Sequence, residues 1–171
     1  NIKTRATAQM INKVVPGLIP SFSVALAEAY NEKTAKKVDF DKDVWFASRK
    51  LDGVRCVTVV DSNGSAKFFS RTGNEFETLA THIKTRPSLW GMVFDGEICL
   101  VDENGNEDFQ SVIKEIKCKD HTIDAPKYFV FDTLTRAEFF EGTSERTFWE
   151  RDFELSRLMD DDYGMMEQLS Q

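Results

Sequence analysis

The sequence predicts an α+β fold, and three observations lead to that prediction. Apolar stretches separated by Asp-Gly and Ser-Asn-Gly are typical of strands joined by tight turns, which favours antiparallel sheets. Apolar residues at helical spacing recur between and after these stretches, which indicates helices that flank the sheets. With 171 residues, 41% of them hydrophobic, the chain can bury the core of one globular domain.

The first third of the chain changes from irregular to helical to extended. Residues 13–22, "KVVPGLIPSF", hold two prolines and a glycine, which predicts an irregular apolar connector. Residues 23–37 have helical spacing, with Ser23 as a possible N-cap. Strands are expected after this helix, at residues 44–51, 54–61 and 66–72.

The rest of the chain alternates between helices and buried strands. Helices are predicted over residues 74–86, 109–118 and 144–159, the last opened by Ser144 or Thr147 as N-cap. Residues 92–102 and 127–134 are apolar on both faces, which is typical of central strands.

Charge and cysteine usage exclude several classes of protein. The net charge of −7 argues against a protein whose main task is to coat nucleic acid. This charge does not exclude a local basic groove, because four cations cluster in sequence, namely Arg49, Lys50, Arg55 and Arg71. The three cysteines form no C-x-x-C pair, which favours reduced thiols over a structural zinc site. No apolar run reaches the roughly 18 residues that cross a membrane, so we expect a cytoplasmic protein without a membrane partner.

The segment "RKLDGVR", residues 49–55, holds the strongest candidate for chemistry. If it is extended, Ser48, Lys50 and Asp52 share one face of a strand, and Gly53 permits a tight turn with positive φ. The cations Arg49 and Arg55 would favour a neutral, nucleophilic Lys50 amine. Four common residues also occur by chance, and a surface hairpin with solvated charges explains the segment equally well.

Three further residues are candidates for the site, and each is ambiguous when taken alone. Glu97 lies in a strand otherwise built for burial, so it needs a cation, a sugar hydroxyl or a metal, or a structural arginine partner. Phe131 could be core, or it could stack on a base, and the strand would place Asp132 on the opposite face. Arg71 in "SRTG" follows a strand, where a side chain can reach into a cleft.

Taken in order, the motifs K-x-D-G-x-R, S-R-x-G, D-G-E and F-D resemble the covalent nucleotidyltransferase superfamily of ATP-dependent polynucleotide ligases and mRNA capping enzymes. The segments "INKVVPGLIP", "LAEAYNEK", "KLDGVRC" and "SRTGNEF" resemble the ATP-dependent DNA ligases of tailed bacteriophages. The similarity covers most of residues 10–135. It implies an ATP-grasp-like adenylation domain, of which this chain would be the N-terminal lobe.

The resemblance implies a role for each matching residue. Lys50 would attack the α-phosphate of ATP and hold AMP, and Arg55 and Arg71 would bind the ribose and phosphate region. Glu97 would contact the ribose hydroxyls and help place Mg²⁺, and Phe131 would stack on the adenine.

Two residues beside the lysine belong to the same implied site. Ser48 would lie at the adenine edge, where many members of the superfamily have glutamate. Arg49 is also expected among the nucleotide-binding residues. AMP would then pass to the 5′-phosphate of nicked double-stranded DNA, in the cytoplasm of a bacterial host if a phage encodes the protein. The sequence indicates no obligate protein partner.

The chain also departs from the superfamily. The later segment with a second metal carboxylate, the lysine-rich strand and the OB-fold domain are not found in it. Residues 1–30 are expected to be the tail of an upstream DNA-binding region with a connector, and residues 31–171 the N-terminal part of the adenylation domain. An RNA ligase, a capping-type nucleotidyltransferase and a non-catalytic nucleotide-binding scaffold are the alternatives.

Overall fold

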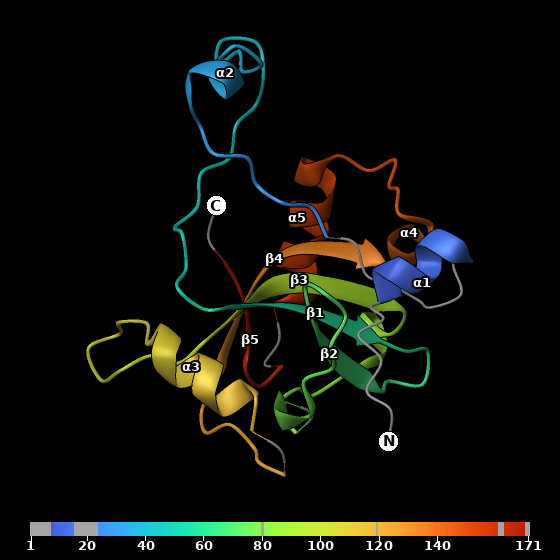
Figure 1. Ribbon diagram of the computed structural model, residues 1–171, viewed down its shortest axis with the longest axis vertical. Helices are drawn as coiled ribbons and strands as arrows, with labels where there is room; N and C mark the ends of the chain where they lie inside the picture. The colour runs from blue at the N-terminus through green and yellow to red at the C-terminus, as the bar shows by residue number, and fades with distance from the viewer. Residues whose placement is uncertain (1–7, 16–23, 80, 119, 161–162, 170–171) are drawn as a thin grey trace.

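A computed structural model describes residues 8–15, 24–79, 81–118, 120–160 and 163–169 of the chain. One five-stranded sheet forms its centre, with the strand order β2-β1-β3-β4-β5 (Figure 1). The strands are β1 (Val54–Val60), β2 (Ala66–Ser70), β3 (Met92–Cys99), β4 (Lys127–Thr135) and β5 (Met166–Gln168). The fold class is confirmed as α+β, and the expected strands at β1 to β4 are present.

The first four strands pair antiparallel, as their short turns predicted. β5 pairs parallel with β4, which differs from the expected antiparallel sheets. The physical reason is the connection, because α4 (Arg136–Glu141) and α5 (Phe148–Leu158) follow β4 and return the chain to its starting end. β5 has three residues, which are too few for the alternation of apolar and polar residues in a strand to be recognised in the sequence.

The predicted helices are present where an apolar stripe packs on the sheet. The described helices include α3 (Phe109–Ile116) and α5, which fall inside their predicted ranges, and Thr147 caps α5 with its side chain. Two further helices were not predicted, α1 (Ala8–Val14) and α4. No helix of the described segments is both long and apolar enough to span a lipid bilayer.

Three predicted elements are wrong. Residues 24–30 have no regular structure, and the helix expected there is the single turn α2 (Glu32–Ala35), capped by Asn31. Ser23 and residues 16–22 of the expected connector lie outside the described residues. The helix expected over 74–86 is replaced, in the described part of that range, by the short 3₁₀ turn η1 (Glu77–Leu79) and by isolated bridges at Glu75 and Ile83, and another 3₁₀ turn, η2 (Pro87–Leu89), follows. Residues 44–51 are not a strand.

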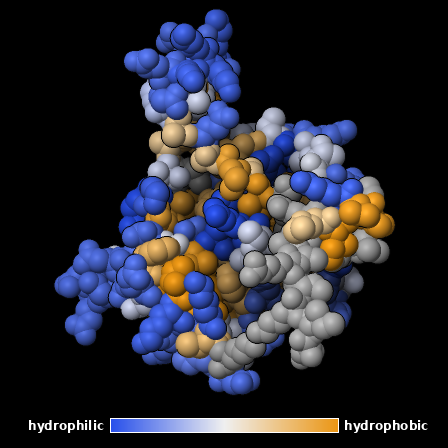
Figure 2. Space-filling view, viewed as in Figure 1, coloured by the Kyte–Doolittle hydropathy of each residue, from blue (hydrophilic) through white to orange (hydrophobic). Residues whose placement is uncertain are grey.

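The sheet has two different faces. One face is the main core, where the buried Tyr128 hydroxyl donates hydrogen bonds to the carbonyls of Cys56 and Phe94, each at 2.9 Å. The other face carries Val57, Val93 and the polar side chains of the candidate site. The segment with α2 projects from this body, and its tip is hydrophilic in Figure 2.

Candidate active site

The segment with Lys50 is an irregular loop that leads into β1. Residues 44–53 form no ladder with another strand, so the alternation expected for Ser48, Lys50 and Asp52 does not apply. All three side chains are exposed, while Leu51 between them is buried with Cys99 and Leu169. The Lys50 amine donates to the neighbouring Leu51 carbonyl at 3.4 Å. An apolar anchor, rather than a strand, therefore fixes this loop.

Glycine is required at position 53 because the backbone there lies very close to β3. A Cβ atom at this position would lie 2.4 Å from the Ile98 carbonyl oxygen and 2.8 Å from Glu97 Cγ. Gly53 is not among the described glycines with positive φ, so the expected left-handed turn is wrong. Its missing side chain lets the backbone after Lys50 lie directly against the strand that carries Glu97.

Arg55, Glu97 and Phe129 form a row across three neighbouring strands, because Arg55 pairs with Glu97 and Glu97 pairs with Phe129. Cross-strand partners lie on the same face of a sheet, so these side chains share the face opposite the main core. Beside this row lies a cleft of about 810 Å³, whose lining includes Gly53, Arg55, Arg71 and Glu97. That volume suits a ligand of nucleotide size.

The Arg55 guanidinium links two strands of the site. Its Nε and Nη2 donate to the two carboxylate oxygens of Asp95, at 2.5 and 2.6 Å, and its carbon lies 4.7 Å above the centre of the Phe131 ring. The planar fork of arginine suits this bidentate pair. Burial raises the pKa of Asp95, and Arg55 opposes the shift. Arg55 is therefore held against Phe131, the residue expected to stack on adenine.

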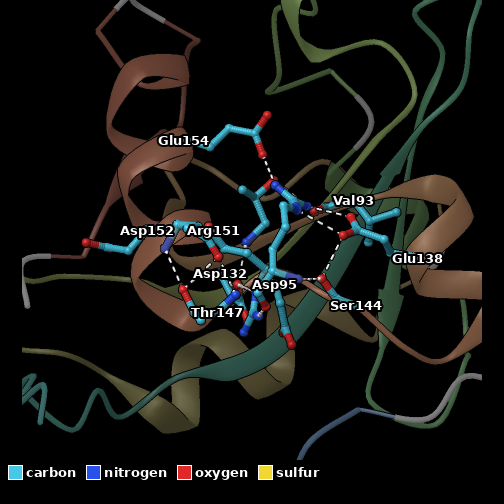
Figure 3. A network of polar contacts seen from close by, with 12 residues as sticks. Val93, Asp95, Asp132, Glu138, Ser144, Thr147, Arg151, Asp152 and Glu154 are labelled. Atoms are coloured by element: carbon cyan, nitrogen blue, oxygen red, sulfur yellow. Dashed lines mark hydrogen bonds and ion pairs between the residues drawn. The ribbon is translucent and has the colours of Figure 1, made fainter. Parts of the chain in front are cut away.

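Asp132 lies on the same face as Phe131, contrary to the alternation expected from the sequence. The register between β3 and β4 shifts, so that Gly96 pairs with Val130 while Asp95 pairs with Asp132. This β-bulge leaves Phe131 as the extra residue and turns both side chains to one face. Figure 3 shows the resulting network, in which Arg151 of α5 holds Asp132 at 2.7 and 3.1 Å.

Glu97 has the surroundings of a ligand-binding carboxylate. It is half-buried, and burial raises its pKa, while the charges of Arg55 and Lys50 and the Gly53 amide oppose the shift. Arg55, its partner across the strands, is bound to Asp95 rather than to Glu97. Within the described residues no group of three or more His, Cys, Asp or Glu side chains could hold a metal alone. A single carboxylate fits Mg²⁺ only when nucleotide phosphates supply further oxygens.

Of the remaining predicted site residues, Arg71 lines the cleft and Arg49 belongs to the loop. Arg71 is exposed in the turn after β2, where Gly73 has φ +83° and the Gly73 amide donates to the Ser70 carbonyl. Arg49 is exposed and points to Glu107, with 2.7 Å between its Nη2 and Oε1. Each arginine flanking Lys50 therefore has a carboxylate partner, and neither presents the unpaired charge that the sequence suggested.

Three polar residues of this region were not predicted as parts of the site, namely Asp95, Glu107 and Arg151. Asp95 could have been found, because it lies two residues before Glu97 in a buried strand. Glu107 and Arg151 come from a loop and a helix that show no local pattern for a site. Their contacts depend on the packing of elements far apart in the sequence.

The lysine loop lies beside a cleft lined by two arginines and a half-buried carboxylate, and arginine side chains in a cleft suit a ligand that carries phosphate groups. The family described as "ATP dependent DNA ligase domain" matches residues 24–170. Because this match covers most of the chain, the protein belongs to that family.

The DNA ligases of the Enterobacteria phages T4 and T6 are each 38% identical to the chain over 79 residues, which are 44% of this chain and 16% of each ligase. The chain thus matches only a small part of these curated relatives.

Solved structures show the same fold. The structure described as Pmar-Lig_Pre has a TM-score of 0.71 and 23% identity, covering 97% of this chain and 39% of that one. The ATP-dependent DNA ligase from bacteriophage T7, in complex with ATP, has a TM-score of 0.54 and 15% identity. That match covers 72% of this chain and 47% of the T7 chain.

Proposed function

We propose that this protein carries the nucleophile of an ATP-dependent DNA ligase and that Lys50 becomes covalently attached to AMP. The observation that supports this most is the cleft beside the Lys50 loop, whose lining includes two cations and one carboxylate, namely Arg55, Arg71 and Glu97. The family match and the phage DNA ligases agree with this chemistry. The division of the chain at residue 30 stays a prediction.

In the first step the Lys50 amine attacks the α-phosphorus of ATP. A nitrogen–phosphorus bond forms, the bond from the α-phosphorus to the bridging oxygen breaks, and pyrophosphate leaves while the amine loses its proton. Arg55 and Arg71 would neutralise phosphate charge, and positioning and charge neutralisation are the main needs of phosphoryl transfer. In the structure Lys50 Nζ donates a hydrogen bond to the Leu51 carbonyl, so the lysine side chain would turn toward the cleft when ATP binds.

The other residues would hold the nucleotide. Glu97 would bind the ribose hydroxyls, Phe131 would stack on the adenine and Ser48 would lie at its edge. Mg²⁺, if held by Glu97 together with phosphate oxygens, would supply further charge neutralisation. The pairing of Arg49 with Glu107 gives Arg49 a role in fixing the loop in addition to the nucleotide contact proposed for it.

AMP would pass from Lys50 to the 5′-phosphate of a nick, and the adjacent 3′-hydroxyl would then displace AMP and seal the strand. Nicked double-stranded DNA and ATP are accordingly the proposed substrates. A ligase of a phage or bacterium would act where the DNA is, in the cytoplasm of the bacterial cell.

The test is intact-mass spectrometry after incubation with ATP and Mg²⁺, on this chain and on a longer protein that continues it through the remaining length of its solved relatives. An adenylyl group on Lys50 that pyrophosphate removes is expected. Lys50→Ala should take up none, while the control Lys36→Ala, an exposed lysine near α2, should label normally. Labelling of Lys50 by GTP in place of ATP would indicate the capping-type alternative. A ligation assay that compares nicked DNA with nicked RNA would separate the DNA ligase from the RNA-ligase alternative. Bound ATP without any adduct would overturn the proposal in favour of a non-catalytic nucleotide-binding module.

A further inference from the structure

Glu107 is a buried carboxylate beside the Lys50 loop. It lies between β3 and α3, where it forms an isolated bridge with Val101. Its side chain is only 8% exposed, although neighbouring Asp108 and Asn106 are exposed. Burial of a carboxylate costs several kcal/mol unless cations or hydrogen-bond donors compensate for it. The groups that compensate for it here all belong to the Lys50 loop.

The two oxygens of Glu107 hold residues on either side of Lys50. Oε2 accepts a hydrogen bond from the Asp52 amide at 2.8 Å, across 55 residues of sequence. Oε1 lies 2.7 Å from Arg49 Nη2, where it attracts the guanidinium without hydrogen-bonding geometry. One carboxylate thus joins the residue before the lysine to a residue shortly after it.

This contact replaces the ladder hydrogen bonds that a strand would have given the loop. Residues 44–53 have no strand partner, and Lys50 itself is exposed. The described contacts that fix the loop include the Phe46 ring against Phe148, the buried Leu51, the close packing of Gly53 on β3, and Glu107. Without Glu107, both the Asp52 amide and the Arg49 side chain would lose their partner.

We propose that Glu107 is a positioning residue that fixes the loop from Arg49 to Asp52 and thereby the place from which the Lys50 amine reacts. This inference rests on the proposed function of Lys50. Glu107 itself does not touch the reacting atoms. Its effect is on the geometry of attack, and geometry of this kind governs phosphoryl transfer.

The test compares Glu107→Ala and Glu107→Gln with the control Glu103→Gln, an exposed acid of the same loop. The first measurement is hydrogen–deuterium exchange of residues 49–53, which needs no catalytic activity. We expect the Asp52 amide to exchange about tenfold faster in Glu107→Ala, because it loses a hydrogen bond to a charged acceptor. Glu107→Gln retains an acceptor oxygen and should give a smaller change, and the β-strands should exchange as in the wild type.

The second measurement is the rate of Lys50–AMP formation at increasing ATP concentration. Glu107→Ala is expected to lower the rate at saturating ATP about tenfold or more and to change the half-saturating ATP concentration less than about threefold, because position rather than affinity is lost. Glu103→Gln should change neither value.

The outcomes separate the two proposals. Unchanged Asp52 exchange, or an unchanged rate in Glu107→Ala, overturns the positioning role and leaves the proposed function intact. If the wild type forms no adduct, the proposed function fails, and the exchange measurement alone then decides whether Glu107 fixes the loop.

Discussion

Asp95 and Asp132 face each other on neighbouring strands, and a different arginine holds each carboxylate. Two carboxylates side by side repel, and the charge of Asp132 adds to the effect of burial in raising the pKa of Asp95. Arg151 binds Asp132 from α5, which leaves both oxygens of Asp95 for Arg55. The alternating charges of this network, part of which Figure 3 shows, connect the helix to the arginine of the cleft.

Loss of Arg151 is expected to destabilise the protein and to disturb Arg55. Arg151→Met leaves the Asp132 charge partly buried beside Asp95, and the loss of charged hydrogen bonds should lower the free energy of unfolding by about 2 kcal/mol. Urea denaturation measures this loss, and Arg157→Met, an exposed arginine of the same helix, is the control. Equal stability of the two variants would show that the network contributes nothing to the fold.

Much of the fold could be predicted from the sequence, because the apolar positions of these elements are also the positions that are buried in the structure. β3 and β4 are long and apolar, and α3 has an apolar stripe that packs on the sheet. The Lys50 loop could not be predicted, because its "FASRKLD" has the alternation of a strand but is held by tertiary contacts, among them the buried Leu51 and the hydrogen bond from the Asp52 amide to Glu107. Nor could the side of Asp132 be predicted, since the β-bulge that decides it depends on pairing with β3.

The same distinction applies to the site. Arg55 and Glu97 lie within strands and Arg71 follows one, so the sheet brings all three residues to the lining of one cleft. Glu107 is one acid among several in "DENGNED", and only tertiary packing makes it the buried one.

Phe131 should matter for ATP binding in a way that Phe129 does not. Both side chains lie partly buried on the same face of β4, but only Phe131 contacts the Arg55 guanidinium. Phe131→Leu is expected to weaken ATP binding about tenfold, since base–aromatic stacking contributes about 1–3 kcal/mol. Calorimetric titration with ATP measures the binding affinity, and Phe129→Leu is the matched control. An equal effect of both variants would remove the stacking role.

The stabilities of the Ala and Asn variants should rank in opposite order at Gly53 and at Gly105. At Gly105 the φ angle is +81° and a Cβ atom would have no neighbour within 4 Å, so Asn, which tolerates this conformation, should be milder than Ala. At Gly53 the limit is space, so Asn should be worse than Ala, and Ala itself should cost about 1–3 kcal/mol. Thermal denaturation of the four variants gives the order. The same order at both glycines would contradict the explanation from close approach.

The ion pairs of Arg146 predict how stability depends on pH. Arg146 binds Glu138 at the start of α4 and Glu154 in α5, and the hydrogen bonds from Arg146 hold the pKa of Glu138 well below its usual range. Glu138 also accepts hydrogen bonds from Ser144 and from the Thr135 amide. The carboxylate is therefore favoured in the folded protein over the unfolded chain.

A carboxyl group with a lowered pKa in the folded state stabilises the protein above its unfolded pKa, about 4.3 for Glu, and loses that contribution as the pH falls toward its folded pKa. We expect Glu138→Gln to cost about 1–2 kcal/mol at pH 7, because Gln still caps the helix but cannot pair with Arg146. This difference from the wild type should shrink between about pH 5 and pH 2, since the wild-type carboxylate becomes protonated there. Denaturation at several pH values measures it, with Glu141→Gln at the exposed end of α4 as the control. A difference that does not change with pH would show that Glu138 stabilises the helix through its cap alone.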